Sequence, residues 1–143
     1  MKSTFEFSEM KAEHYDEAYK LWEESEEIEL TIGDTKESFE KYLKRNPEMS
    51  YVCIDRDSGF IVGTILCGHD GRRGFIYHLT VVKEYRGKSI GKKLLEKSIS
   101  SLKANGIERC MIMVKTSNET GNSFWEKTGW DKRDELCMYS KNL

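Results

Sequence analysis

Residues 81–95, VVKEYRGKSIGKKLL, join an apolar strand-like run to an amphipathic helix-like run through a basic turn that contains glycine. The turn itself spans residues 86–91. The first backbone N–H groups of a helix have no partner inside the helix, and the helix dipole makes that end partly positive. Glycine in the turn lets an anion approach the backbone closely. The turn is therefore a candidate phosphate-binding site.

One kind of phosphate site is excluded by spacing. The tripeptide Gly87-Lys88-Ser89 resembles the end of the nucleotide-binding P-loop, G-x-x-x-x-G-K-S/T. That motif requires a second glycine five positions before Gly87, and Val82 occupies that position. A nucleoside-triphosphate site of this type is not expected. An ordinary strand-turn-helix with a lysine-rich solvated surface remains an alternative to a phosphate site.

The elements that position the turn can be read from apolar spacing. The preceding strand is indicated by Ile76, Leu79, Val81 and Val82. The following helix is indicated by apolar residues at helical spacing, Ile90, Leu94, Leu95, Ile99 and Leu102, and is expected to end near Asn105 before Gly106. A buried strand would thus lead directly into the phosphate turn.

The rest of the chain predicts a mixed α/β layer fold. Period-two patterns predict further strands, and helical periodicity predicts three more helices. A capping box of Asp34 and Glu37 would open the second helix, and Pro47 would end it. The expected strands cover residues 4–9, 51–54, 60–66, 75–82, 110–114 and 136–139, and the other helices residues 13–26 and 121–127. A single domain over residues 1–143 follows from the length.

Composition favours a soluble cytoplasmic protein. The formal net charge is −2 and 34% of the residues are charged, which gives no support to nucleic-acid binding over the whole surface. No apolar stretch approaches the roughly 18 residues that cross a membrane, and the N-terminus lacks the apolar core of a secretion signal. The four cysteines are far apart in the sequence, so we expect buried thiols and no metal site.

The order of elements and two motifs resemble the GNAT superfamily of N-acetyltransferases. The first motif is the family's Arg-x-x-Gly-x-Gly, written here as residues 86–91 with Ser89 in place of the first glycine. The second is Asn-x-x-Ala-x-x-Phe-Tyr-x-x-x-Gly-Phe. This chain matches it in register with Asn118, Gly121, Phe124, Trp125, Gly129 and Trp130. The resemblance covers nearly the whole chain.

The resemblance implies a GNAT-like acyl-CoA N-acyltransferase fold, with a central, mostly antiparallel sheet flanked by about four helices. It also implies acetyl-CoA as co-substrate. The pyrophosphate would lie on the backbone of the turn, and the pantetheine arm would pair with the preceding strand. The implied cofactor-binding residues are Leu79, Thr80, Val81, Val82, Arg86, Gly87, Lys88, Ser89, Ile90, Gly91, Lys92 and Asn118. A helix N-cap is the structural alternative for Asn118.

Acetyl transfer requires a neutral amine to attack a thioester carbonyl, so a group or water chain must take the proton of the ammonium. The backbone N–H of Val81 would stabilise the negative charge that develops on oxygen, by resemblance. His78, expected on the strand face opposite Tyr77, is a candidate base or else a packed strand histidine. Trp125 stands where many relatives carry a tyrosine acid, and its indole donates a hydrogen bond but no proton. Weaker candidate bases are Tyr77, Glu23, Glu24 and Tyr139.

The acceptor side would be shaped by the first two helices and their link, which is acidic from Glu23 to Asp34. A cationic amine would be attracted there, although the segment also fits a solvated helix end. The sequence therefore predicts an N-acetyltransferase that acts on a primary amine of a small molecule, peptide or protein, as a monomer or homodimer. The alternative is a CoA-binding regulatory module with little or no catalytic activity.

Overall fold

The structure is a computed structural model that describes residues 4–143. It divides the chain into two compact units, one that ends at Met113 and one that runs from Val114 to Leu143. The first contains β1 (Phe5–Glu9), α1 (Tyr15–Glu23), α2 (Lys36–Arg45), β2 (Tyr51–Asp55), β3 (Ile61–His69), β4 (Gly74–Val81), α3 (Ile90–Ala104) and β5 (Cys110–Ile112). Three short 3-10 turns, η1 (Ala12–His14), η2 (Ile32–Asp34) and η3 (Lys83–Tyr85), precede α1, α2 and α3. The second unit contains α4 (Glu119–Lys127).

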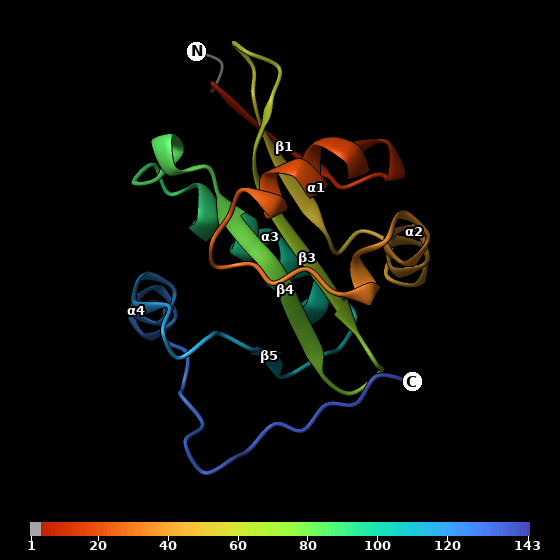
Figure 1. The fold of residues 1–143 in the computed structure, drawn as a ribbon, viewed down its shortest axis with the longest axis vertical. Coiled ribbons are helices and arrows are strands. Elements are labelled where there is room, and N and C mark those ends of the chain that lie inside the picture. The colour runs from red at the N-terminus through yellow and green to blue at the C-terminus, as the bar shows by residue number, and fades with distance from the viewer. Residues whose placement is uncertain (1–3) are drawn as a thin grey trace. The chain divides into compact units, whose positions relative to one another are not determined.

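The strands of the first unit form one sheet in the order β1-β2-β3-β4-β5. Neighbours are antiparallel except for β4 and β5, which are parallel. Helices α1 and α2 lie on one face of this sheet and α3 on the other (Figure 1). Gly63 of β3 lets α3 approach closely, because a Cβ there would lie 3.1 Å from both Ile90 and Leu94. The expected mixed α/β fold with a mostly antiparallel sheet is confirmed.

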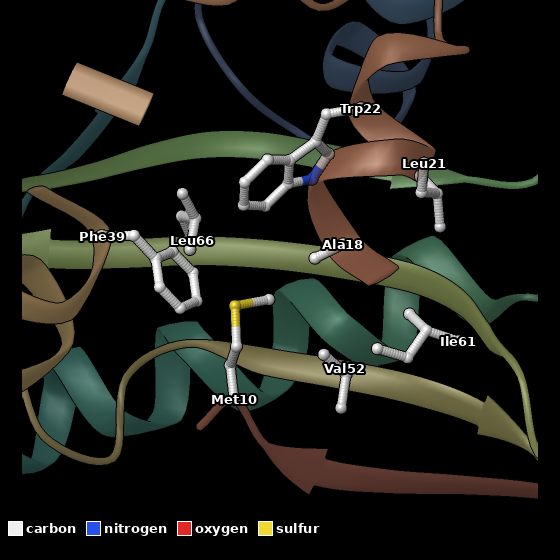
Figure 2. Packing of buried hydrophobic residues seen from close by; sticks show 8 residues of the cluster. All are labelled: Met10, Ala18, Leu21, Trp22, Phe39, Val52, Ile61 and Leu66. Atoms are coloured by element: carbon white, nitrogen blue, oxygen red, sulfur yellow. The ribbon is translucent and has the colours of Figure 1, made fainter. Parts of the chain in front are cut away.

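A buried cluster fixes α1 against the sheet. Figure 2 shows the indole of Trp22, the ring of Phe39 and the side chain of Met10 gathered near Leu66 of β3. Trp22 is fully buried. Burial of a large apolar side chain contributes about 1.5–3 kcal/mol, so this cluster holds the end of α1 beside the middle of the sheet. The linker from α1 to α2, residues 24–35, starts at this end of α1.

The second helix begins one residue later than its expected capping box implied. Its N-cap is Thr35, whose hydroxyl accepts a hydrogen bond from the Ser38 N–H at 3.2 Å. Asp34 instead closes η2, where its carboxylate accepts from the Thr31 N–H at 2.9 Å. The expected Asp34–Glu37 box is therefore wrong, because Thr31-x-x-Asp34 matches the same spacing three residues earlier.

The second unit differs from expectation at its end. In the part of the chain that the structure describes, residues 136–139 form no strand. Leu136 and Met138 are 60% and 68% exposed there. Alternating apolar residues form a strand only where another strand supplies hydrogen bonds, and no such partner is found within this unit. The expected last strand is wrong.

The four cysteines are free thiols as expected, and burial raises the pKa of the Cys53 and Cys67 thiols to about 11 and 12. Cys110 is only half-buried and Cys137 is exposed, so the expectation of four buried thiols is wrong. The expectation of one domain over residues 1–143 stays a prediction.

Candidate active site

The turn before α3 presents backbone N–H groups to solvent. Gly87 and Ser89 adopt left-handed backbone conformations, with φ of 81° and 64°. Ser89 is the N-cap of α3, but its hydroxyl makes no capping hydrogen bond. A left-handed conformation costs a residue with a Cβ about 1–2 kcal/mol, which is the cost of serine at the family's first glycine position. Within residues 4–143, the N–H groups of residues 87–89 donate no hydrogen bond. These donors suit an anion.

Arg86 is directed at two groups of the protein. Its Nε donates to the Val81 carbonyl at 3.1 Å, and its Nη2 lies 3.7 Å from a carboxylate oxygen of Glu27. Lys88 and Lys92, by contrast, are exposed beside the turn. The expected contact between the Arg86 guanidinium and a pyrophosphate stays a prediction.

The end of β4 carries an N–H that points away from its strand neighbour. The Val82 N–H donates to the Val62 carbonyl at 2.8 Å, and Val81 is paired with Gly63. Hydrogen-bonded and non-hydrogen-bonded pairs alternate along antiparallel strands. Val81 is therefore in a non-bonded pair, and its N–H and C=O face the side of β5. Among the described residues, this N–H has no partner.

The edge of β4 on the β5 side is paired over only three residues. β5 pairs with Gly74, Phe75 and Ile76 and with no later residue of β4. The strand continues to Val81 and leads into η3 and the turn. An unpaired strand edge binds an extended chain through main-chain hydrogen bonds. This edge and the free N–H groups of the turn fit the amide-containing arm and the pyrophosphate of a CoA molecule.

A β-bulge near the middle of β4 sets the direction of His78. The register between β3 and β4 shifts between Thr64 and Leu66, and His78 has a φ of 48°. Tyr77 packs edge-on against Tyr42 of α2, and His78 packs against Trp22 of α1, with ring centroids 4.7 Å apart. Both side chains thus lie on the α1–α2 face. The expectation that they face opposite sides is wrong, because the bulge interrupts strand alternation.

The imidazole of His78 is paired with the carboxylate of Asp34. Their Nε2 and Oδ1 atoms are 2.7 Å apart, and the side chains are 13% and 11% exposed. Burial would raise the pKa of Asp34, but hydrogen bonds from His78 and Thr31 outweigh it and hold the pKa below its ordinary value. This contact was not predicted, because in the sequence Asp34 fits the spacing of a capping box with Glu37.

The linker after α1 also contacts β4. The Ser25 hydroxyl is 3.1 Å from the Thr80 hydroxyl and donates to Glu27 at 2.9 Å. Because Glu27 also contacts Arg86, the linker is attached to both the strand and the turn. Of the acidic residues in this segment, Glu23, Glu24, Glu26 and Glu29 are exposed. These contacts had no sequence signal beyond the polar composition of the linker.

Asn118 and Trp125 belong to the second unit. The Asn118 Oδ1 accepts from the Gly121 N–H at 2.8 Å, which is the helix N-cap geometry. Trp125 is 8% exposed, and its ring centroid is 4.7 Å from that of Trp130 and 5.2 Å from that of Phe124. The expected contacts of Asn118 and Trp125 with the cofactor and reaction centre stay predictions.

We expect Trp125→Phe to change stability more than chemistry. The smaller ring would leave part of the Phe124–Trp130 contact unfilled, at a cost of ~1–2 kcal/mol in the free energy of unfolding. The indole delivers no proton, so kcat should fall by less than about tenfold. Thermal unfolding and steady-state kinetics check both values. A loss of about 10³-fold with stability intact would show that the indole acts in the transition state.

Residues 4–143 contain no group of three or more histidine, cysteine, aspartate or glutamate side chains that could hold a metal ion. In the same residues, no helix is both long and apolar enough to cross a membrane.

Comparison with known proteins gives a family for this chain. The model of the acetyltransferase (GNAT) family matches residues 9–130. N-alpha-acetyltransferase 30 of Schizosaccharomyces pombe is 33% identical over 124 residues, which cover 80% of this chain and 81% of that protein. An acetyltransferase of Sodalis glossinidius is 30% identical over 129 residues, with 90% and 89% covered.

The fold is found among solved structures as well. Arabidopsis thaliana Naa50, in complex with the bisubstrate analogue CoA-Ac-MVNAL, is similar with a TM-score of 0.73. It is 20% identical, and the match covers 92% of this chain and 86% of that one. The similarity shows the same fold.

Proposed function

Because the chain belongs to the acetyltransferase (GNAT) family, we propose that it transfers the acetyl group of acetyl-CoA to the N-terminal amine of a peptide or protein. That it is an N-acetyltransferase follows from the family and from relatives that are named as an N-alpha-acetyltransferase and an acetyltransferase. The observation that carries the use of CoA is the unpaired edge of β4, which continues into the turn of free N–H groups.

In this proposal, the turn and the end of β4 bind different parts of acetyl-CoA. The N–H groups of residues 87–89 and the start of α3 bind the pyrophosphate through hydrogen bonds and the helix dipole. The backbone of Val81 pairs with the pantetheine arm or stabilises the charge that develops on the acetyl oxygen. The bound co-substrate supplies an activated acetyl group. Val81 and the turn hold it in place without a large rearrangement.

The acceptor side begins at the bulge. His78 is proposed as the base that takes the proton of the acceptor ammonium. Tyr77 beside it is 38% exposed, and Ile32, two residues before Asp34, is 69% exposed. These apolar groups suit the side chains that follow a peptide α-amine. The proposed acceptor is therefore a peptide.

A competition assay tests this choice of acceptor. Peptides with free N-termini, the same peptides with blocked N-termini, and a polyamine are offered together with acetyl-CoA, and products are identified by mass spectrometry. We expect acetylation of the free α-amine only, with faster turnover when an apolar side chain follows it. Acetylation of the blocked peptides on lysine, or of the polyamine alone, would contradict the proposal.

A small cationic amine is the second candidate, favoured by the acidic linker. Neutralising three of its exposed carboxylates in Glu23→Gln, Glu24→Gln and Glu26→Gln should then flatten the fall of kcat/KM with rising salt, because exposed charges are screened over about 8 Å at physiological ionic strength. Glu27 is left unchanged because it contacts Arg86.

The control replaces three exposed glutamates outside the linker, Glu6, Glu96 and Glu108, by glutamine. It makes the same change in net charge and should keep the salt dependence of the unmodified protein. If the linker variant also keeps it, the acidic segment is a solvated surface and does not attract the acceptor. Steady-state kinetics between low and high salt provide the comparison.

A further inference from the structure

We propose that Asp34 is a positioning residue that holds the His78 imidazole with its proton on Nε2, so that Nδ1 is the atom that takes the proton of the acceptor amine. The proposal rests on the proposed function, since it assigns the base role to His78. The structure brings the two residues into contact although they are 44 positions apart in the chain.

The direction of the hydrogen bond follows from chemistry. An ionised carboxylate only accepts hydrogen bonds, so the ring nitrogen 2.7 Å from Oδ1 must donate. The Thr31 N–H and His78 both hold the pKa of Asp34 low against the opposing effect of burial, so Asp34 is ionised at neutral pH. In a neutral imidazole, a proton on Nε2 leaves Nδ1 with the free electron pair.

Two hydrogen bonds fix the position of Asp34 independently of His78. The Tyr15 hydroxyl donates to the Asp34 carbonyl at 2.6 Å, and the Thr31 N–H binds Oδ2 at 2.9 Å. Asp34 therefore cannot follow His78 if the ring turns, and the ring must adapt to it. A carboxylate fixed in this way orients a histidine better than one on a free side chain.

The imidazole is held from the other side. The Trp22 Nε1 donates to the Thr64 hydroxyl at 2.9 Å, and that hydroxyl donates to the His78 carbonyl at 2.8 Å. The Trp22 ring also packs on the imidazole. Trp22 therefore contacts the His78 ring directly and the His78 carbonyl through the Thr64 hydroxyl. A histidine that served only for packing would not need the charged carboxylate of Asp34 as a hydrogen-bond partner.

The titratable groups around the ring come from three elements. Asp34 comes from the linker, Tyr15 reaches it from α1, and Tyr77 precedes it on β4. Burial raises the pKa of both Tyr15 and Tyr77, so these phenols stay neutral near pH 7. In the part of the chain that the structure describes, Asp34 is the anionic side chain that hydrogen-bonds the imidazole.

The proton transfer balances. Nδ1 of His78 takes one proton from the acceptor ammonium, and the freed electron pair of the amine forms a bond to the acetyl carbon. The bond from that carbon to sulfur breaks, and sulfur leaves with the electron pair as thiolate. The second proton of the attacking nitrogen passes to the thiolate through water. His78 then releases its proton to solvent.

The tautomer is measured directly by long-range proton–nitrogen correlation spectra of the imidazoles. The chain has three histidines, and His14 and His69 serve as references within the same spectrum. In the unmodified protein, we expect the proton of His78 on Nε2. In Asp34→Asn, the amide would donate to Nε2, so the proton should move to Nδ1 while the references stay unchanged. An unchanged His78 pattern in Asp34→Asn would overturn the proposal.

Kinetics separate this proposal from the proposed function. Asp34→Asn should lower kcat/KM by about 10²-fold, which is the effect expected when a base is lost. It should also change the acidic limb of the profile of kcat/KM against pH. The double variant with His78→Gln should lose no more than His78→Gln alone, because both changes remove one device. Losses that multiply would overturn the positioning role.

The matched control is Asp57→Asn, which makes the same change of side chain at an exposed position in the turn between β2 and β3. It should keep kcat and the pH profile. If His78→Gln is fully active, the base assignment fails. If His78→Gln loses activity while Asp34→Asn keeps the rate and pH profile of the unmodified protein, the base stands and the positioning role falls.

Discussion

The Gly91→Glu variant is expected to fold and to lose at least 100-fold in affinity for acetyl-CoA. Gly91 is the second residue of α3, at the end whose free N–H groups and dipole favour an anion. A carboxylate there would occupy or repel the pyrophosphate. It would also stabilise the helix end by about 0.3–1 kcal/mol, so unfolding is not the expected cause. A 100-fold loss is about 2.7 kcal/mol of binding free energy, well within the range of calorimetry.

Ser100→Glu is the matched control for that variant. Ser100 is exposed on the same helix and nine residues further on, which is about 13 Å along the axis. Charges that far apart are largely screened at physiological salt. The control should therefore bind acetyl-CoA normally. Normal affinity in a folded Gly91→Glu protein would contradict the phosphate site before α3.

The second large effect is expected at His78. His78→Gln should lower kcat/KM by about a hundredfold, because the variant removes a base. The affinity for acetyl-CoA should stay the same, because the edge of β4 is left intact. The backbone of residue 78 is left-handed, and asparagine adopts this conformation more readily than glutamine. His78→Asn therefore provides a second variant if glutamine disturbs the bulge.

Steady-state kinetics and calorimetry check the two parts of that prediction. Full activity in both folded variants would show that His78 is a packed strand histidine. Loss of acetyl-CoA affinity together with activity would show that the variants disturb β4 itself. Only a loss of kcat/KM with cofactor affinity kept agrees with the proposed base.

The strands and helices with a regular spacing of apolar residues were predictable from the sequence. Apolar alternation identified the central strands, and the spacing from Ile90 to Leu102 identified α3 with its end before Gly106, whose φ is 77°. The turn of residues 86–91 was also found at its correct place, because strand and helix periods change there. These features are local, so local patterns are enough to define them.

The features that complete the candidate site depend on distant contacts. The bulge at His78 changes the direction of a side chain without any change in the apolar pattern of β4. Asp34 reaches His78 only because α1 and the sheet share the Trp22 cluster. The strand expected at residues 136–139 failed for the related reason that its alternation specified no partner strand.

Turnover with an isotope-labelled acetyl donor tests the central claim most directly. The protein is incubated with labelled acetyl-CoA and a panel of free-N-terminus peptides, and free CoA thiol and labelled amide are counted together. The account predicts equal amounts of both products, lost in Gly91→Glu because the donor does not bind and reduced about a hundredfold in His78→Gln. Tight binding of acetyl-CoA with no labelled amide from any amine would contradict it and would favour a CoA-binding regulatory module.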